Sequence, residues 1–288
     1  MALKKIAVIG ATGMLGIPVV AELVKAGFEV TALVRNPERA RRVLPARTSL
    51  VQADAADINS LKRGLAGQDA VYLSLSIAPS ERKDEFHAEA EGLDNILAAA
   101  RACGVRRIAY LSALIQDGDA KGWWVIDVWR KAIGKIKGSG IPHSIFYPSN
   151  FMETLPLRHG MGRILALIGT ARHPNYWIAA ADFGKQVARS FQLDEAANRE
   201  FVIQGPAALT YDEAGRRFAQ HTRPRRFVFK IPLLLVKALG AMSPAMNFNA
   251  RIMDAVLSYP EVFKAEETWK MLGKPLTTID EFARSHSQ

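Results

Sequence analysis

Three glycines, Gly10, Gly13 and Gly16, lie where an apolar run, "KIAVIG", passes into an apolar helical pattern, "LGIPVVAELVKAG". The N-terminus of a helix carries unpaired backbone N–H groups and a partial positive charge. Glycines in the preceding turn let a pyrophosphate approach those groups without meeting a Cβ atom. The spacing therefore predicts a dinucleotide-binding turn, although a tight strand-to-helix turn without a ligand would use the same residues.

The residue that ends the second apolar run, "EVTALVR", is Arg35. In a nicotinamide-binding fold an acidic residue near this point, about 20 residues after the glycines, would hold the ribose 2′-hydroxyl of NAD(H). A guanidinium instead suits a 2′-phosphate, and Asn36 and Arg39 could assist it. The sequence therefore predicts NADP(H) rather than NAD(H); the alternative is a solvent-exposed arginine at a strand end.

Two further strand ends are expected to contribute to cofactor binding. Asp54 follows the third run, "TSLVQA", and could accept a hydrogen bond from the adenine amino group. The alternative is a helix N-cap, a role that Asp57 fills more naturally for the pattern "INSLKRGL". Leu75 and Ser76 end the fourth run, and we expect them to line the far side of the ribose and the nicotinamide.

Hydride transfer from a nicotinamide also needs a source of protons, and three residues are candidates. Lys131 lies in a predicted helix, where burial would favour proton transfer near neutral pH; alternatively, it only holds ribose hydroxyls. Ser112 ends the fifth strand and either donates a hydrogen bond to a substrate carbonyl or caps the strand. Tyr147 is a second acid or a packed strand residue. No group of His, Asp and Glu has metal-ligand spacing, so no metal is expected.

The elements that must position these residues alternate between strand and helix. Apolar runs rich in Val, Ile, Leu and Ala are typical of strands buried on both faces, and the helical patterns between them end in glycine. This alternation predicts an α/β fold, a Rossmann-type doubly wound parallel sheet with a smaller, mostly helical C-terminal substrate domain. The rhythm changes after Pro148. We therefore expect an NADP(H)-binding Rossmann domain over residues 1–150, drawing also on about 181–205, and a substrate-binding lid region over 151–288.

Composition and charge narrow the functional classes. The chain has 288 residues, a net charge of +10 and one cysteine, Cys103, which fits a reducing cytoplasm and excludes a disulfide framework. Its basic residues match no nucleic-acid-binding motif, so no nucleic acid partner is expected. The longest apolar stretch, Ile231–Met246, contains Lys237 and is too short for a transmembrane segment. We interpret it as a helix that covers an apolar pocket, with an amphipathic surface helix as the alternative.

Together these segments resemble the NmrA-like branch of the atypical short-chain dehydrogenases/reductases. The resemblance runs in order along nearly the whole chain, through "VIGATGMLG", "ALVRNPERA", "VQADAADINSL", "DAVYLSLS", "RIAYLSAL", "SGIPHSIFYPSNFMETL", "WIAAADFGKQVAR" and "FVIQGPAALTYDEAGRRFA". It implies a cofactor lying across the carboxyl ends of the strands. The residues it implies for cofactor binding are Thr12, Gly13, Met14 and Leu15 at the pyrophosphate, Arg35 at the 2′-phosphate, Asp54 at the adenine, Lys131 at the nicotinamide ribose, and Pro148, Asn150 and Phe151 beside the nicotinamide.

One departure from the superfamily pattern bears on catalysis. Where a Tyr-x-x-x-Lys motif would place a tyrosine acid, four residues before Lys131, this chain has Asp127, and Tyr147 stands where arginine is common in the family. The aromatic and Met-rich segments "GWWVIDVW" and "NFMETL" indicate either an apolar pocket or ordinary core. We therefore expect an NADPH-dependent oxidoreductase that reduces a hydrophobic carbonyl, quinone or conjugated enone. The alternatives are a non-catalytic NADP(H)-binding redox sensor and an accessory subunit, and a homodimer is possible in each case.

Overall fold

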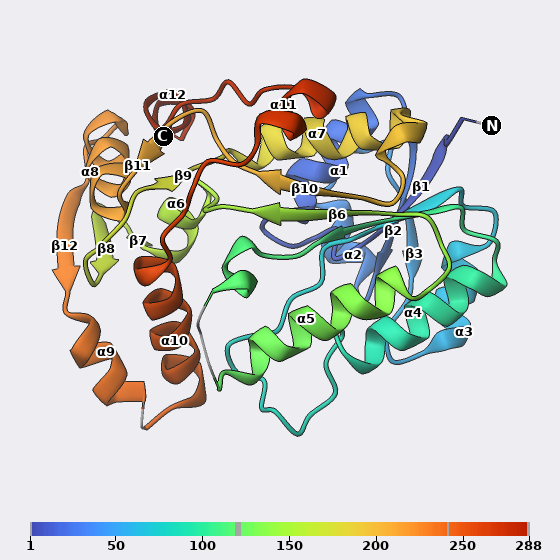
Figure 1. Ribbon diagram of the computed structural model, residues 1–288, viewed down its shortest axis with the longest axis horizontal. Helices are drawn as coiled ribbons and strands as arrows, with labels where there is room; N and C mark the ends of the chain where they lie inside the picture. Colours follow the sequence, from blue (N-terminus) through green and yellow to red (C-terminus); the bar gives the residue numbers. More distant parts are fainter. Residues whose placement is uncertain (1, 119–121, 241, 287–288) are drawn as a thin grey trace.

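A seven-stranded parallel sheet forms the centre of the computed structural model, which describes residues 2–118, 122–240 and 242–286 (Figure 1). The strand order is β10-β6-β5-β4-β1-β2-β3. The strands are β1 (Lys5–Ile9), β2 (Glu29–Val34), β3 (Ser49–Gln52), β4 (Ala70–Leu73), β5 (Arg107–Leu111), β6 (His143–Pro148) and β10 (Arg199–Ile203). Each was expected from an apolar run, and the predicted Rossmann-type α/β fold is confirmed.

Helices cover both faces of this sheet. Successive side chains of a strand point to opposite faces, so Ile6 and Val8 join one core while Ala7 and Ile9 join the other. The first core is covered by α1 (Gly16–Lys25) and α7 (Ala180–Gln192). The second is covered by α3 (Ile58–Leu65), α4 (Glu91–Ala102) and α5 (Trp124–Lys137). Figure 1 shows the two groups on opposite sides of the sheet. The short helix α2 (Pro37–Arg41) follows β2.

Side-chain caps fix the starts of two helices, and the cap at Asp57 was predicted from the sequence. The Asp57 side chain caps α3 by accepting a hydrogen bond from the Asn59 backbone N–H at 2.9 Å. Thr210 and Glu213 form a capping box at the start of α8 (Tyr211–His221), where each side chain accepts from the other residue's backbone N–H. These caps satisfy donors that helical bonds leave unpaired, and each one marks the residue before its helix begins.

The region after Pro148 contains more strand than we expected. One small sheet is formed by β7 (Gly160–Met161), β8 (Ile164–Ile168) and β12 (Phe227–Ile231), and another by β9 (Asn175–Tyr176) and β11 (Ala208–Leu209). Most of these strands are too short to show a period of two in the sequence. The remaining elements are the helices α6 (Thr154–Arg158), α9 (Leu233–Gly240), α10 (Pro244–Ser258), α11 (Glu266–Leu272) and α12 (Ile279–Ser285), with 3₁₀ turns at Leu114–Asp117 and Asp194–Ala196.

The apolar stretch Ile231–Met246 covers a pocket with its C-terminal part only. Gly240, Met242, Ser243 and Pro244 line a cavity of about 370 Å³ together with Trp123 and Trp124. Three leucines of α9, Leu234, Leu235 and Leu239, are exposed, whereas Val236 and Gly240 are buried. The end of the stretch therefore lines a pocket as expected, whereas the three leucines of α9 face outward. No helix in the described ranges combines the length and the apolar character that a membrane crossing needs.

Candidate functional site

The turn between β1 and α1 is built so that only glycine fits at two of its positions. Gly10 has a φ of 83°, and a Cβ atom there would lie 2.0 Å from the carbonyl oxygen of Ser74. A Cβ atom on Gly16 would lie 2.1 Å from the Gly10 carbonyl oxygen. Gly13 is exposed, and its N–H donates to the Gly10 carbonyl at 3.1 Å. Gly10 and Gly16 thus allow the tight backbone packing of the turn. Gly13 leaves the exposed surface of the turn without a side chain.

The N-terminus of α1 is open to an anion. Leu15, at the N-cap, provides no side-chain cap, and the first turn contains no acidic residue. Thr12, Met14 and Leu15 are each half-buried around this point. Uncapped N–H groups at a helix N-terminus bind phosphate through hydrogen bonds and the helix dipole. The cradle therefore fits the pyrophosphate of a dinucleotide, which was the expectation from the glycine spacing.

A cavity of about 420 Å³ lies at the ends of β2 and β3 and brings Arg35 and Asp54 together. Because Ile9 pairs with Leu33, this cavity and the glycine turn lie on adjacent strands at the same edge of the sheet. The exposed Arg35 guanidinium is available to an anion there. The cavity is lined by Arg35, Gln52, Ala53, Asp54, Asp57, Ser60 and Arg63.

Arg63 is a functional candidate that the sequence reasoning missed. It lies on α3 one turn after Ser60, so both side chains face the same cavity as Arg35. A helical-wheel view of "INSLKRGL" starting at the Asp57 cap would have shown this. Asp54 is less free than we expected, because its Oδ1 accepts a hydrogen bond from the Ala56 N–H at 2.9 Å. Its second carboxylate oxygen remains the candidate acceptor for the adenine amino group.

The carboxyl ends of β4, β5 and β6 lie beside the glycine turn. The Ser74 N–H donates to the Ile9 carbonyl at 2.9 Å, and beyond it Leu75 is half-buried and Ser76 exposed. The Ser112 N–H donates to the Phe146 carbonyl at 2.9 Å. The Ser112 Oγ is buried and makes no hydrogen bond of normal geometry within the described residues. The Tyr110 hydroxyl lies near Ser112 but donates to Glu89, so Ser112 stays a candidate for a hydrogen bond to a ligand.

The other two candidate proton donors are less well placed. Lys131 is on the exposed side of α5, so the burial that motivated an acid–base role is absent. Tyr147 is buried and its Oη donates to Glu200 Oε2 at 2.6 Å. Burial and this carboxylate raise the pKa of Tyr147 well above that of a free tyrosine. Tyr147 therefore has the contacts of a packed strand residue rather than of a proton donor near neutral pH.

The segment after β6 offers backbone rather than side chains to a nicotinamide. Pro148 is buried and Asn150 half-buried, and the Asn150 carbonyl accepts from the Ile178 N–H at 3.0 Å. Phe151 packs edge-on against Phe183, with ring centroids 5.4 Å apart. Because Phe151 belongs to the core, its expected contact with a cofactor is limited to main-chain atoms.

A cleft of about 890 Å³ opens between the segment after β5, α10 and the chain that follows α10. Trp123 and Tyr259 supply aromatic surface, but Asp117, Arg251 and Lys264 also line it. The expected apolar pocket is therefore mixed in character, and Met152 of "NFMETL" is core, only 1% exposed. The complete lining is Ile115, Asp117, Gly118, Trp123, Arg251, Asp254, Ala255, Ser258, Tyr259, Pro260 and Lys264. Within the described ranges no group of three His, Cys, Asp or Glu residues could hold a metal ion.

A strap after α10, residues 259–264, closes one side of this cleft. Glu261 anchors the strap, since its Oε2 accepts from Ser149 Oγ at 2.7 Å and its Oε1 from Gln204 Nε2 at 2.6 Å. Ser149 and Gln204 directly follow β6 and β10. Opposite the strap, Arg130 of α5 donates to the Gln116 carbonyl at 2.6 Å and holds the segment after β5. The cleft therefore lies between fixed walls at the carboxyl edge of the sheet.

Comparison with known proteins finds relatives that match this arrangement. The NAD(P)H-binding family model matches residues 10–152. Quinone oxidoreductase 2 of Escherichia coli is 30% identical over 220 residues, which cover 73% of this chain and 68% of that protein. A crystal structure of the NADPH-dependent quinone oxidoreductase from Escherichia coli, complexed with NADPH, has a TM-score of 0.72 and 25% identity and covers 97% of this chain and 99% of that one. The photosystem II assembly factor Ycf39 of Trieres chinensis is 24% identical over 292 residues, covering 96% of this chain and 90% of that protein.

Proposed function

The chain belongs to the NmrA-like family of atypical short-chain dehydrogenases/reductases and carries an NAD(P)H-binding domain, and from this premise we propose that it is an NADPH-dependent reductase of a quinone or a related hydrophobic carbonyl or enone. The observation that carries the cofactor part is the pairing of Arg35 and Arg63 in one cavity beside the glycine turn. Two guanidinium groups match the charge and geometry of a 2′-phosphate.

Different parts of the chain bind the cofactor and the substrate in this proposed function. Residues 1–150, with about 181–205, hold NADPH through the glycine turn and the strand ends. Residues 151–288 supply α10 and the strap, which form the far wall of the cleft. The name of the Escherichia coli relative, quinone oxidoreductase 2, supports a quinone as the substrate class.

The chemistry requires one hydride and one proton for each substrate molecule. Bound NADPH would supply the hydride, and a quinone that accepts it and takes up one proton leaves as the hydroquinone beside NADP⁺. Ser112, whose Oγ is buried, would donate a hydrogen bond to the oxygen on which negative charge develops. Lys131 would then contact ribose hydroxyls from the exposed side of α5, and the proton would come from solvent within the open cleft.

The test is a calorimetric titration of the apo-protein with NADPH, NADP⁺, NADH and NAD⁺, followed by a turnover assay with quinones, enones and aldehydes. We expect tighter binding of the two phosphorylated cofactors and oxidation of NADPH by quinones. Tight NADPH binding without turnover of any substrate in the panel would contradict the reductase activity but would support the cofactor site.

A second candidate function is a non-catalytic NADP(H) sensor. The observation in its favour is the lack of a well-placed acid: Asp127 replaces the motif tyrosine, Lys131 is exposed and Tyr147 is engaged with Glu200. A sensor must bind NADP⁺ and NADPH with unequal affinity, because a ligand shifts a conformation only through differential binding. The same titration measures that difference, and equal affinities would exclude this candidate. The similarity to the assembly factor Ycf39 is the reason to follow the titration with a search for protein partners.

A further inference from the structure

The exposed apolar side chains of this molecule are concentrated far from the cofactor site. Nine of the 13 large hydrophobic residues that are exposed in the described part of the chain lie between residues 157 and 242. Those on the small sheet and on α9 define what we call the apolar face: Met161, Ile164, Phe227, Phe229, Leu234, Leu235 and Leu239. Scattered exposed hydrophobics need no explanation, but a gathered set marks an interaction surface.

Strand register places three of these side chains in one row. Phe227 of β12 pairs with Ile164 of β8, which pairs with Met161 of β7. Paired residues on neighbouring strands project to the same side of a sheet. The opposite side, formed by Leu165 and Leu167, is buried against α8. Phe227 and Met161 are 68% and 69% exposed, so the outer side is open at this row, whereas Ala166, two residues after Ile164 on the same side of β8, is buried.

The row continues along the same side of the molecule into α9. Phe229 follows Phe227 on that side of β12, and α9 begins two residues after the strand ends. Leu234 is 78% exposed on this helix. Figure 1 shows β12 and α9 one after the other along the margin of the molecule that lies away from the N-terminus.

The charge around the apolar face is strongly positive. Residues 214–253 contain eight Lys or Arg and no Asp or Glu, so this segment carries +8 of the net +10 of the chain. Three of these cations, Arg217, Lys230 and Lys237, are paired with the acids Asp280, Asp212 and Asp254 of other elements. Arg225 and Arg226 immediately precede Phe227, and the Arg163 guanidinium lies 5.8 Å from the centroid of the Phe227 ring.

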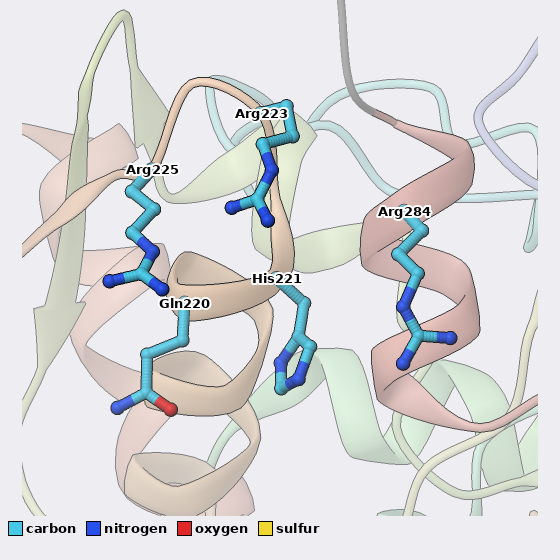
Figure 2. Close-up of a pocket in the computed structure, with 5 residues that line it drawn as sticks. All are labelled: Gln220, His221, Arg223, Arg225 and Arg284. Carbon is cyan, nitrogen blue, oxygen red and sulfur yellow. The ribbon is translucent and has the colours of Figure 1, made fainter.

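Two basic cavities open beside the row. The larger, about 620 Å³, is lined by Arg223 and Arg225 of the loop before β12, Arg284 of α12, and Gln220 and His221 at the end of α8. Figure 2 shows these five side chains and the three elements from which they come. A second cavity of about 380 Å³ lies between Arg163 and Arg226. Clustered guanidinium groups favour phosphate oxygens.

We propose that the apolar face and its arginine rim dock on the surface of an anionic phospholipid membrane. Exposed Phe, Leu and Met beside Arg is the composition that inserts at the boundary between headgroups and acyl chains. The rim would bind lipid phosphates while Phe227, Phe229 and the α9 leucines enter the apolar layer. A second copy of this chain is a poorer occupant, because a two-fold interface would bring the same arginines against one another. The inference does not depend on the proposed reductase activity.

The test is flotation of the protein with vesicles of phosphatidylcholine alone and of phosphatidylcholine mixed with phosphatidylglycerol. We expect binding to the mixed vesicles only, and loss of binding at high salt because screening weakens the arginine contacts. The Phe227→Ser/Phe229→Ser double variant should bind at least about tenfold more weakly. Arg225→Glu should also weaken binding, whereas the matched controls Leu276→Ser and Arg47→Glu should not.

Three results would overturn the proposal. One is failure of the native protein to float with the mixed vesicles, and another is equal binding to neutral vesicles, which would remove the arginine rim from the mechanism. The third is a dimer in analytical sedimentation that the double variant abolishes, which would assign the face to a second copy. All substituted residues are exposed, and circular dichroism with NADPH titration verifies that each variant is folded.

Discussion

The Tyr110 hydroxyl donates a hydrogen bond to Glu89 Oε1 at 2.5 Å inside the core beneath the end of β5. The second oxygen of that carboxyl group accepts from Trp129 Nε1 at 3.1 Å. Both Glu89 and Tyr110 are almost fully buried, and no cation is paired with Glu89 among the described contacts. Burial raises the pKa of Glu89 from about 4.5 to about 7, although both hydrogen bonds oppose the shift.

The first prediction concerns the pH dependence of stability that this carboxyl group imposes. A group whose pKa is raised on folding binds more protons in the native state, so its contribution falls as pH rises between about 4.5 and 7. Glu89→Gln removes that titration and keeps a polar side chain near Tyr110. We expect the free energy of unfolding of this variant to gain on that of the native protein as pH increases through this range.

The measurement is urea unfolding of both proteins at a series of pH values, compared as a difference. The difference is essential, because Glu153 also has a pKa raised to about 7, while burial lowers the pKa of His159 to about 4 and gives the opposite slope. A difference that does not change with pH would mean that Glu89 is ionised in the folded protein.

The second prediction concerns the two arginines in the cavity beside the glycine turn. Arg35→Ala should weaken NADPH binding by about 1.5–3 kcal/mol, the worth of a charge-assisted hydrogen bond, and leave NADH binding nearly unchanged. Arg63→Ala should act in the same sense if both guanidinium groups contact the 2′-phosphate. Arg47→Ala is the control, because Arg47 precedes β3 at the opposite edge of the sheet. Equal losses for NADPH and NADH in Arg35→Ala would show that Arg35 does not read the phosphate.

The third prediction separates glycines that build the turn from the one that faces the ligand. Gly10→Ala should destabilise the fold by at least about 2 kcal/mol, because its φ is positive and the new Cβ would meet Ser74. Gly13→Ala meets only the Gly10 carbonyl, at 3.3 Å, so the fold should persist while NADPH binding weakens. Thermal unfolding and calorimetric titration of both variants check this. Native affinity in a folded Gly13→Ala protein would place the pyrophosphate elsewhere.

These residues also mark how far the sequence alone could predict the site. Gly10 and Arg35 were predictable because each follows a strand in a local pattern whose geometry the Rossmann fold fixes. A helical wheel places Arg63 near Ser60, but the sequence does not show that this face meets Arg35. The role of Glu261 was not predictable either, since it depends on which strap comes to lie at the sheet edge. The burial of single side chains was equally hard to predict. The next residue after Lys131, Ala132, is on the buried face of α5, whereas Lys131 is exposed. Most strands of the small sheets were not predicted, because they are too short to show an alternating pattern in the sequence.

The fourth prediction tests the unpartnered hydroxyl of Ser112. Ser112→Ala should lower kcat for quinone reduction about 10²-fold if the hydroxyl stabilises developing charge on the substrate oxygen. NADPH affinity and stability should change little, because the Oγ makes no normal hydrogen bond in the described structure. Ser139→Ala, whose hydroxyl accepts from the Ile141 N–H, is a control for loss of a buried serine. Unchanged kcat in Ser112→Ala would leave it as a strand-end residue.

The last prediction concerns Glu261, which ties the strap to the ends of β6 and β10. Besides Ser149 and Gln204, its carboxylate accepts from Asn175 Nδ2 at 3.1 Å and from the Tyr176 N–H at 3.3 Å. Glu261→Gln puts an amide NH₂ group against donors, so at least one of these hydrogen bonds is lost. We expect a loss of about 1–3 kcal/mol in the free energy of unfolding and a raised KM for the quinone, since the strap forms one wall of the cleft.

The control for that experiment is Glu266→Gln on the exposed start of α11, which should change neither quantity. Stability is measured by urea unfolding and KM by NADPH oxidation at saturating cofactor. If Glu261→Gln lowers stability but leaves KM unchanged, the strap is structural and the substrate lies nearer to Trp123. If neither quantity changes, water replaces the Glu261 carboxylate as the acceptor for its four donors without loss of stability. Glu261 then does not hold the wall of the cleft in place.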